Sequence, residues 1–242
     1  MYKLEDKKII FDKDFNFKKV LPLIGYGSHS DVYKIKIGNE VFALKVFNGL
    51  RVEHLKNYKA KLNINIESYI SPIRILYIDN KFKGYLMKFC KGKDLEKRKL
   101  DMPVEEFALS STKLINDTKK LTILKYNIYD TFISNVMYDE GFKMIDMDDY
   151  PYESSKTLRE INDINSIRLN QLLVNVFLNS TGLAGMFFQN VEMTKLMSKC
   201  TSGKITFEEL FNTVCTMAYN VTDEEINKVS EIGKVLKKSK NI

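Results

Sequence analysis

The sequence lacks the features that would place it in a membrane or an oxidising compartment. No run of about 18 or more apolar residues occurs, so no segment is expected to cross a bilayer. The N-terminal residues MYKLEDKKII mix charged and apolar side chains, so a signal peptide is not expected. The three cysteines, Cys90, Cys200 and Cys215, fit neither a disulfide framework nor a metal site. These absences predict a protein with reduced thiols in the cytoplasm, or one delivered into a host cytosol.

Charge and apolar content set broad limits on partners and size. The 38 Lys and Arg residues outnumber the 31 Asp and Glu residues, which gives a net charge of +7. A basic surface favours polyanions such as ATP, acidic protein faces or nucleic acid. We interpret most of these lysines as an ordinary solvated surface, so nucleic acid is not an expected partner. The 44% of hydrophobic residues can fill a core in one large domain or in two lobes.

Three polar residues in the middle of the chain suggest a cation site. Asp130 and Asn135 precede, and Asp146 follows, the short apolar runs Val136–Tyr138 and Phe142–Ile145, which are joined by an Asp-Glu-Gly turn. Because the two ends of a hairpin meet, we expect the three side chains to converge. Mg²⁺ prefers carboxylate and amide oxygens together with substrate phosphates. The stretch therefore predicts a site for a metal and a phosphate group.

The N-terminal part predicts an antiparallel meander of three strands. Lys19–Ile24 is rich in apolar residues, Asp31–Ile37 alternates with the period of two that half-buried strands have, and Glu40–Phe47 is expected to be another strand. The first two are joined by the glycine-containing turn Gly25–Ser30. Glycines let backbone N–H groups approach phosphate oxygens closely, because no Cβ stands in the way.

Lys45 stands out on the third of these strands. It shares its strand parity with Ala43 and Phe47, whereas Leu44 and Val46 face the other way. Both faces of the strand therefore look covered, and an inward-facing lysine needs an anionic partner. An edge-strand lysine that points to solvent is the alternative.

Four motifs together resemble the protein kinases. GYGSHSDV, FALK, DTFISN and IDMD are similar to the glycine-rich loop, strand-three lysine, catalytic loop and metal-binding motif of that family. The resemblance covers roughly residues 18–175. It implies an α+β, bilobal fold with an N-lobe (residues 1–89) of small antiparallel sheet and one helix. A mainly helical C-lobe (residues 90–242) and a hinge at about 87–92 complete the implied fold.

The resemblance also implies ATP and Mg²⁺ as ligands. Lys45 would hold the α- and β-phosphates, and the backbone of Gly25–Ser28 would cover the β- and γ-phosphates. Asn135 and Asp146 would bind Mg²⁺, and Asp130 would orient a substrate hydroxyl and accept its proton. Around adenine, Met87 would close the back of the pocket, while the backbone of Lys88 and Cys90 would face the base. The implied nucleotide-binding residues are Ile24, Gly25, Tyr26, Gly27, Ser28, Val32, Ala43, Lys45, Met87, Lys88, Cys90 and Met137.

Two acidic residues are predicted to support this site. A helix is expected over Gly49–Asn63, and in kinases this helix supplies a glutamate that pairs with the lysine. Glu53 lies on that helix and is favoured over Glu67, which stays the alternative. Asp163 would accept backbone N–H bonds from the catalytic loop, unless it is an ordinary surface aspartate of its helix.

Helix caps and a second hairpin mark the remaining elements. Pro72–Ile78 and Phe82–Phe89 predict a hairpin around Asp79-Asn80, and a helix is expected over Val104–Leu121. Capping-box spacing predicts further helix starts, the first of them running to about Leu178. These starts are at Thr157-x-x-Glu160, Thr206-x-x-Glu209 and Thr222-x-x-Glu225.

Departures from the kinase pattern narrow the predicted function. Ile128-Tyr129 replaces the His-Arg pair before the catalytic aspartate, and no Ala-Pro-Glu segment lies between Asp146 and Asp163. This shortening resembles minimal bacterial protein kinases. We therefore predict a minimal Ser/Thr protein kinase with a protein substrate. The alternatives are a small-molecule kinase or nucleotidyltransferase on the same fold, or a nucleotide-binding scaffold without activity.

Overall fold

The chain forms two compact units in the computed structural model, which describes residues 9–11, 19–27, 29–49, 55–62, 64–96, 100–222 and 224–239. The first unit comprises Met1–Lys91 together with Ile145–Asp148. The second comprises Gly92–Met144 and Asp149–Ile242. The short stretch Ile145–Asp148 therefore leaves the second unit and contributes its side chains to the first.

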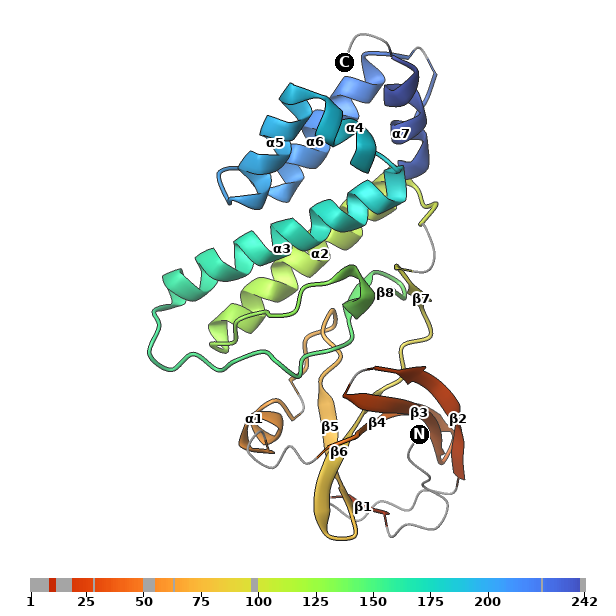
Figure 1. Cartoon of the computed structure of the whole chain (residues 1–242), viewed down its shortest axis with the longest axis vertical. Helices are drawn as coiled ribbons and strands as arrows, with labels where there is room; N and C mark the ends of the chain where they lie inside the picture. Colours follow the sequence, from red (N-terminus) through yellow and green to blue (C-terminus); the bar gives the residue numbers. More distant parts are fainter. Residues whose placement is uncertain are drawn as a thin grey trace. The chain divides into compact units, whose positions relative to one another are not determined.

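The first unit is built on one antiparallel sheet (Figure 1). Its six strands lie in the order β1-β5-β6-β4-β3-β2. The predicted meander is present as β2, β3 and β4, and β4 is paired on both sides. The edge-strand alternative for Lys45 is therefore wrong. The strands are β1 (Ile9–Phe11), β2 (Lys19–Tyr26), β3 (Ser30–Ile37), β4 (Glu40–Phe47), β5 (Pro72–Ile78) and β6 (Lys81–Lys88).

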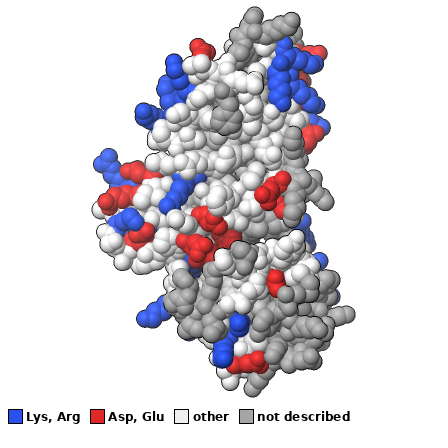
Figure 2. Space-filling view, viewed as in Figure 1, with Lys and Arg blue, Asp and Glu red and all other residues white. Residues whose placement is uncertain are grey.

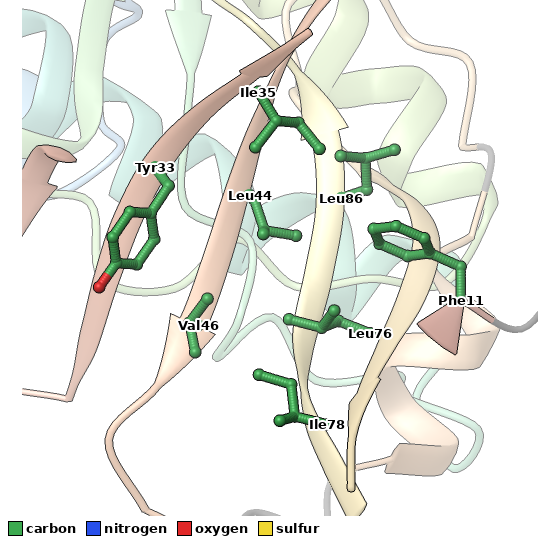
Figure 3. Packing of buried hydrophobic residues seen from close by; sticks show 8 residues of the cluster. All are labelled: Phe11, Tyr33, Ile35, Leu44, Val46, Leu76, Ile78 and Leu86. Atoms are coloured by element: carbon green, nitrogen blue, oxygen red, sulfur yellow. The ribbon is translucent and has the colours of Figure 1, made fainter. Parts of the chain in front are cut away.

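Both faces of this sheet are covered by apolar side chains, as the parity of β4 predicts. On one face Leu44 and Val46 join a cluster whose side chains converge from neighbouring strands (Figure 3). On the other face Ala43 and Phe47 pack with Tyr58, which comes from the short helix α1 (Leu55–Ala60). The alternation of strand side chains explains this division, and it assigns Lys45 to the α1-facing side.

Of two local predictions in this unit, the hairpin is confirmed and the helix lies partly outside the described residues. The β5–β6 hairpin turns at Asp79-Asn80, with φ angles of 51° and 62°, as a two-residue turn of type I′ requires. This prediction is confirmed. Of the helix expected over Gly49–Asn63, the structure shows α1 and a following turn at Lys61-Leu62. Residues 50–54 and 63 lie outside the described residues.

The second unit is mainly helical, with long helices α2 and α3 running side by side (Figure 1). An aromatic cluster of Phe107, Phe177, Phe207 and Phe211 joins α2, α3 and α6. The helices are α2 (Val104–Ile123), α3 (Leu158–Thr181), α4 (Ala184–Gln189), α5 (Val191–Thr201), α6 (Phe207–Tyr219) and α7 (Val229–Lys238). A small sheet β7-β8-β9 consists of Lys93–Asp94, Val136–Tyr138 and Phe142–Met144, and a 3₁₀ turn η2 spans Ile133–Asn135.

Two of the three predicted helix starts are confirmed. Thr157 with Glu160 and Thr206 with Glu209 each form a reciprocal capping box, at α3 and at α6. The third prediction is wrong, because α7 begins at Val229. At the predicted start, the Thr222 hydroxyl accepts a hydrogen bond from the Glu224 N–H at 3.1 Å, so Thr222 closes a local turn and caps no helix.

Basic and acidic side chains both occur on the surface of the protein. On the face that Figure 2 draws, Lys and Arg side chains are dispersed in separate groups among acidic ones.

Burial raises the pKa of the Cys200 thiol to about 12 and that of the Cys215 thiol to about 11. Both therefore stay protonated and unreactive at neutral pH. Within the described ranges, no helix has the length and apolarity to cross a membrane.

Candidate active site

In the first unit, Lys45 lies against two carboxylates. Its ammonium is 2.7 Å from Oδ2 of Asp146 and 2.7 Å from Oδ2 of Asp148. The Lys45 and Asp148 side chains are 7% and 8% exposed, whereas that of Asp146 is 31% exposed. The anionic partner predicted for Lys45 is thus present, and Asp146 keeps an open side toward solvent.

Asp148 is held on both of its carboxylate oxygens. The hydroxyl of the buried Tyr85 donates to Oδ1 at 2.5 Å, while Oδ2 faces Lys45. Tyr85 on β6 is the register partner of Lys45 on β4, so the sheet fixes the donor next to the lysine. The backbone N–H of Asp148 donates to Oδ1 of Asp146 at 3.2 Å, which ties the two carboxylates together.

A second buried lysine fixes the main chain of the same segment. Lys61, in the turn after α1, is fully buried and donates to the carbonyl of Met147 at 2.6 Å and to that of Asp148 at 2.8 Å. Its ammonium also lies 5.7 Å from the ring centroid of Tyr58 on α1. Residues 147 and 148 are therefore anchored through backbone and side chain alike.

The pKa shifts in this cluster follow from burial and charge. Burial lowers the pKa of Lys45, but Asp148 and Asp146 outweigh it, so the pKa is raised and the ammonium persists. Burial also raises the pKa of Asp148, an effect that the Lys45 ammonium opposes without cancelling. Burial, followed by the charge of Asp148, raises the pKa of Tyr85 well above its usual range. Tyr85 therefore keeps the proton that it donates.

Most of the residues predicted to surround the nucleotide lie on four adjacent strands of the first unit, β2, β3, β4 and β6. In register, Gly25 faces Val32, Val32 faces Lys45, and Ala43 faces Met87. Ala43 and Met87 are buried, while Ile24, Tyr26 and Lys88 are exposed and Cys90 is intermediate. At the glycine turn the N–H of Gly27 donates to the carbonyl of Ser30 at 2.8 Å. Ser28 lies outside the described residues.

In the second unit, Asp130 has an unusual backbone that Asn135 stabilises. Its φ angle of 51° lies in the left-handed region, which aspartate tolerates better than most residues and which is often strained at functional sites. The Asn135 amide nitrogen donates to the Asp130 carbonyl at 2.9 Å and to its Oδ2 at 3.1 Å. The predicted pair Asp130 and Asn135 is thus in direct contact.

Helix α3 holds the loop before Asp130, but through Asn165 and not through Asp163. The buried Asn165 accepts the N–H of Ile128 at 2.8 Å through Oδ1 and donates to the carbonyl of Tyr126 at 2.9 Å. Arg168, one turn further on, donates to the Ile128 carbonyl and stacks on the ring of Tyr129. Asp163 is exposed, which is the alternative that the sequence left open.

Replacing Asn165 by leucine is expected to destabilise the second unit. The change strands the buried N–H of Ile128 and the carbonyl of Tyr126, so the free energy of unfolding should fall by roughly 3 kcal/mol in urea denaturation. The matched control, Asn162→Leu at an exposed position of the same helix, should stay within about 0.5 kcal/mol of the wild type. Equal stability of the two variants would contradict the assigned contacts.

The segment between Asp148 and α3 is short and is anchored to the chain that precedes Asp130. The N–H of Asn127 donates to the Pro151 carbonyl at 3.1 Å, and that of Glu153 donates to the Lys125 carbonyl at 2.8 Å. The Asn127 amide also donates to the Glu153 carboxylate at 2.8 Å. These bonds join the two segments directly.

Two of the predicted metal ligands carry oxygen atoms of the kind that hard cations prefer. Within the described ranges, no three His, Cys, Asp or Glu side chains gather into a metal site of their own. Asp146 offers a carboxylate and Asn135 an amide oxygen, and Mg²⁺ accepts both types of oxygen. Asp146 belongs to the first unit and Asn135 to the second.

The remaining predicted residues are placed as follows. Met137 lies on β8, half-buried, where it pairs with Asp94 of β7. Of the two candidate glutamates for Lys45, Glu53 lies outside the described residues and Glu67 is exposed. Sequence reasoning missed Asp148, Tyr85 and Lys61, because their contacts join distant parts of the chain.

Comparison with known proteins shows the fold. The sequence matches no protein-family model, and no curated protein matches it. The structure is similar to the kinase domain of PknI from Mycobacterium tuberculosis. A point mutant of that domain aligns with a TM-score of 0.58 at 13% identity, over 85% of this chain and 97% of that one. A second PknI kinase-domain structure aligns with a TM-score of 0.54 at 12% identity, over 83% and 96%.

The chain therefore has an α+β, bilobal protein kinase-like fold, as the four sequence motifs predict. At 12–13% identity the likeness extends to the fold alone. What the chain does with this fold has to be argued from its own residues.

Proposed function

We propose that this chain is a phosphotransferase that uses ATP and Mg²⁺, and within that class a minimal serine/threonine protein kinase. The observation that carries the proposal is the pair of Lys45 and Asp146, 2.7 Å apart in space and 101 positions apart in the sequence. The ammonium of a lysine on a strand can bind two phosphates. The partly exposed carboxylate beside it can bind the metal ion that these phosphates share. This is the division of labour that phosphoryl transfer in kinases requires.

Each proposed role uses an atom whose surroundings support it. The Lys45 ammonium binds the α- and β-phosphates, and the Asp146 carboxylate is a ligand of Mg²⁺. The metal ion, when bound, neutralises charge on the phosphate oxygens. Asp130, positioned by Asn135, orients the acceptor hydroxyl and takes its proton. The backbone of residues 25–27 covers the phosphates, and Val32 and Ala43 contact adenine.

The preference for a minimal protein kinase rests on the short segment after Asp148. Its hydrogen bonds to Lys125 and Asn127 order it without a phosphorylated residue. Ile128 and Tyr129 also replace the His-Arg pair through which kinases sense such a phosphate. These features favour an enzyme that is active as synthesised.

The same shortness supports a second candidate, a kinase or nucleotidyltransferase that acts on a small molecule. Such an enzyme needs no segment for docking a peptide, and between Asp146 and Asp163 the sequence has no Ala-Pro-Glu element. We rank it second because residues 183–242 contain few clustered acidic side chains with which to build a pocket for a cationic small molecule.

One experiment separates these functions. The purified chain is incubated with Mg²⁺ and ATP labelled at either the α- or the γ-phosphate, alone and with a cell lysate, followed by mass spectrometry. Incorporation of γ-label into serine or threonine is expected, and it should cease when EDTA removes the metal. Label from the α-phosphate would indicate AMP transfer, and γ-label only in small molecules would favour the second candidate. No transfer of either label would leave a nucleotide-binding scaffold and refute the proposal.

A further inference from the structure

The contacts of Asp148 are unlike those expected for the third residue of a kinase metal motif. That residue is a glycine in the kinase pattern Asp-Phe-Gly, whereas here Asp146-Met147-Asp148 ends in a second carboxylate. The carboxylate is buried, and its Oδ2 lies 2.7 Å from the Lys45 ammonium. A buried carboxylate is costly unless it is paired and hydrogen-bonded, so this one needs a reason to be there.

The geometry points to Asp148 as the residue that positions Lys45 for phosphate binding. In kinases that task belongs to a glutamate of the helix that follows the strand-three lysine. In this chain the described residues place two carboxylates against Lys45, and both come from the metal motif. The inference rests on the proposed function, because it assigns Lys45 a phosphate to bind.

The two carboxylates differ in a way that assigns them different tasks. Asp146 is 31% exposed and is the proposed metal ligand, so part of its charge is directed to Mg²⁺ when the nucleotide binds. Asp148 is buried, and each of its oxygens already has a partner, Tyr85 on one side and Lys45 on the other. Asp148 therefore stays paired with Lys45 both before and after the nucleotide binds. It keeps the Lys45 ammonium in place when the charge of Asp146 is directed to Mg²⁺.

The element that would carry the usual glutamate has the opposite charge at its C-terminal end. Lys61 follows α1 and binds the carbonyls of Met147 and Asp148. Among the described residues, the metal motif thus provides the carboxylate beside Lys45, and the turn after α1 provides a lysine that fixes the main chain of that motif. As a result, one short segment sets both the phosphate-binding lysine and the metal ligand.

The test of this role combines Asp148→Asn with Lys45→Met. Asparagine keeps the shape and an acceptor for Tyr85 but removes the charge, and turnover should fall about 100-fold, the scale expected for misplacing a reacting group. In the Lys45→Met background the same change should have no further effect on turnover, because the group that Asp148 positions is gone. Asp149→Asn, at the exposed neighbouring residue, is the matched control and should turn over like the wild type.

A merely structural role gives a different pattern. If Asp148 only stabilises the fold, its replacement lowers turnover by the same factor with or without Lys45, and that result overturns the inference. Tyr85→Phe is the milder variant, to be used if Asp148→Asn does not fold. It leaves the charges in place and should lower turnover by less than Asp148→Asn, and only while Lys45 is present.

A denaturant experiment tests the pairing independently of any activity. Lys45→Met alone leaves Asp148 buried without its cation, so the unfolding midpoint should drop. Adding Asp148→Asn should raise the midpoint again, because the unpaired charge is removed. If the two losses simply add, the pairing is refuted whatever the enzyme does. If the midpoint recovers but the wild type transfers no label from ATP, the pairing stands and the proposed function fails.

Discussion

Asp130→Ala is expected to lower phosphoryl transfer by about 10²–10⁴-fold, the usual contribution of a positioned general base. The variant keeps Lys45 and Asp146, so the affinity for ATP should be nearly unchanged. Initial rates with γ-labelled ATP and calorimetric titration of ATP measure the two quantities. Turnover equal to that of the wild type would refute the role of Asp130.

The backbone of Asp130 calls for a second variant. Its φ angle of 51° suits Asp and Asn better than Ala, so alanine introduces some strain of its own. Asp130→Asn keeps this conformation and removes only the basic oxygen, and it should be impaired to a similar degree. Glu192→Ala, in the exposed first turn of α5, is a control for removing a carboxylate from the second unit. A loss seen with alanine but not with asparagine would indicate strain instead of chemistry.

Gly84→Ala is expected to have the largest effect on stability. Gly84 lies on β6 with a φ angle of 155°, and an added Cβ would lie 1.9 Å from the backbone carbonyl oxygen of Lys45. Strand β4 would have to move away from β6, or the chain would have to unfold locally. Strain and overpacking together should lower the free energy of unfolding by roughly 3 kcal/mol or more. That is a large part of the 5–15 kcal/mol or so that holds a typical protein together.

Chemical denaturation with Gly49→Ala as the control tests this expectation. A Cβ at Gly49 meets no atom of the described residues within 4 Å, so this variant should unfold at the wild-type midpoint. Because the clash is with Lys45 itself, any folded Gly84→Ala protein should also transfer phosphate more slowly. A Gly84 variant as stable as the Gly49 variant would mean that the two strands separate at little cost.

Local patterns predicted the strands of the first unit because each depends only on near neighbours. The alternation around Lys45 placed Leu44 and Val46 on one face and Ala43 and Phe47 on the other, and the two apolar clusters bear this out. The hairpin at Asp79-Asn80 was equally predictable, since two residues that tolerate positive φ stand between two apolar runs.

Asp163 was predicted to hold the loop before Asp130 because the kinase motif has an aspartate there, although the helical spacing of buried residues favours Asn165. Asn165 is four residues after Ile161 and four before Leu169, and all three are buried on α3. Asp163 is out of phase with them and reaches solvent. The period in the sequence already favoured Asn165, but the resemblance to the kinase motif favoured an aspartate.

The contacts of Asp148 and Lys61 could not be predicted in this way. Lys61 and Met147 are separated by 86 positions, and the bond between them exists only once the sheet and α1 have been assembled. The sequence shows three nearby aspartates after Ile145, with no local feature that marks Asp148 as the buried one. Such pairings depend on tertiary packing, which neither propensity nor period encodes.

The double anchoring of Met147 and Asp148 has a consequence for inhibitor discovery. A ligand that binds only when Met147 and Asp148 have left their observed position must first break the contacts of this segment with Lys61, Tyr85 and Lys45. Each buried polar group left without a partner costs about 1–3 kcal/mol, and every 1.4 kcal/mol or so weakens affinity tenfold. Screens against this chain should therefore yield compounds that accept the segment as it stands, and few that require it to move.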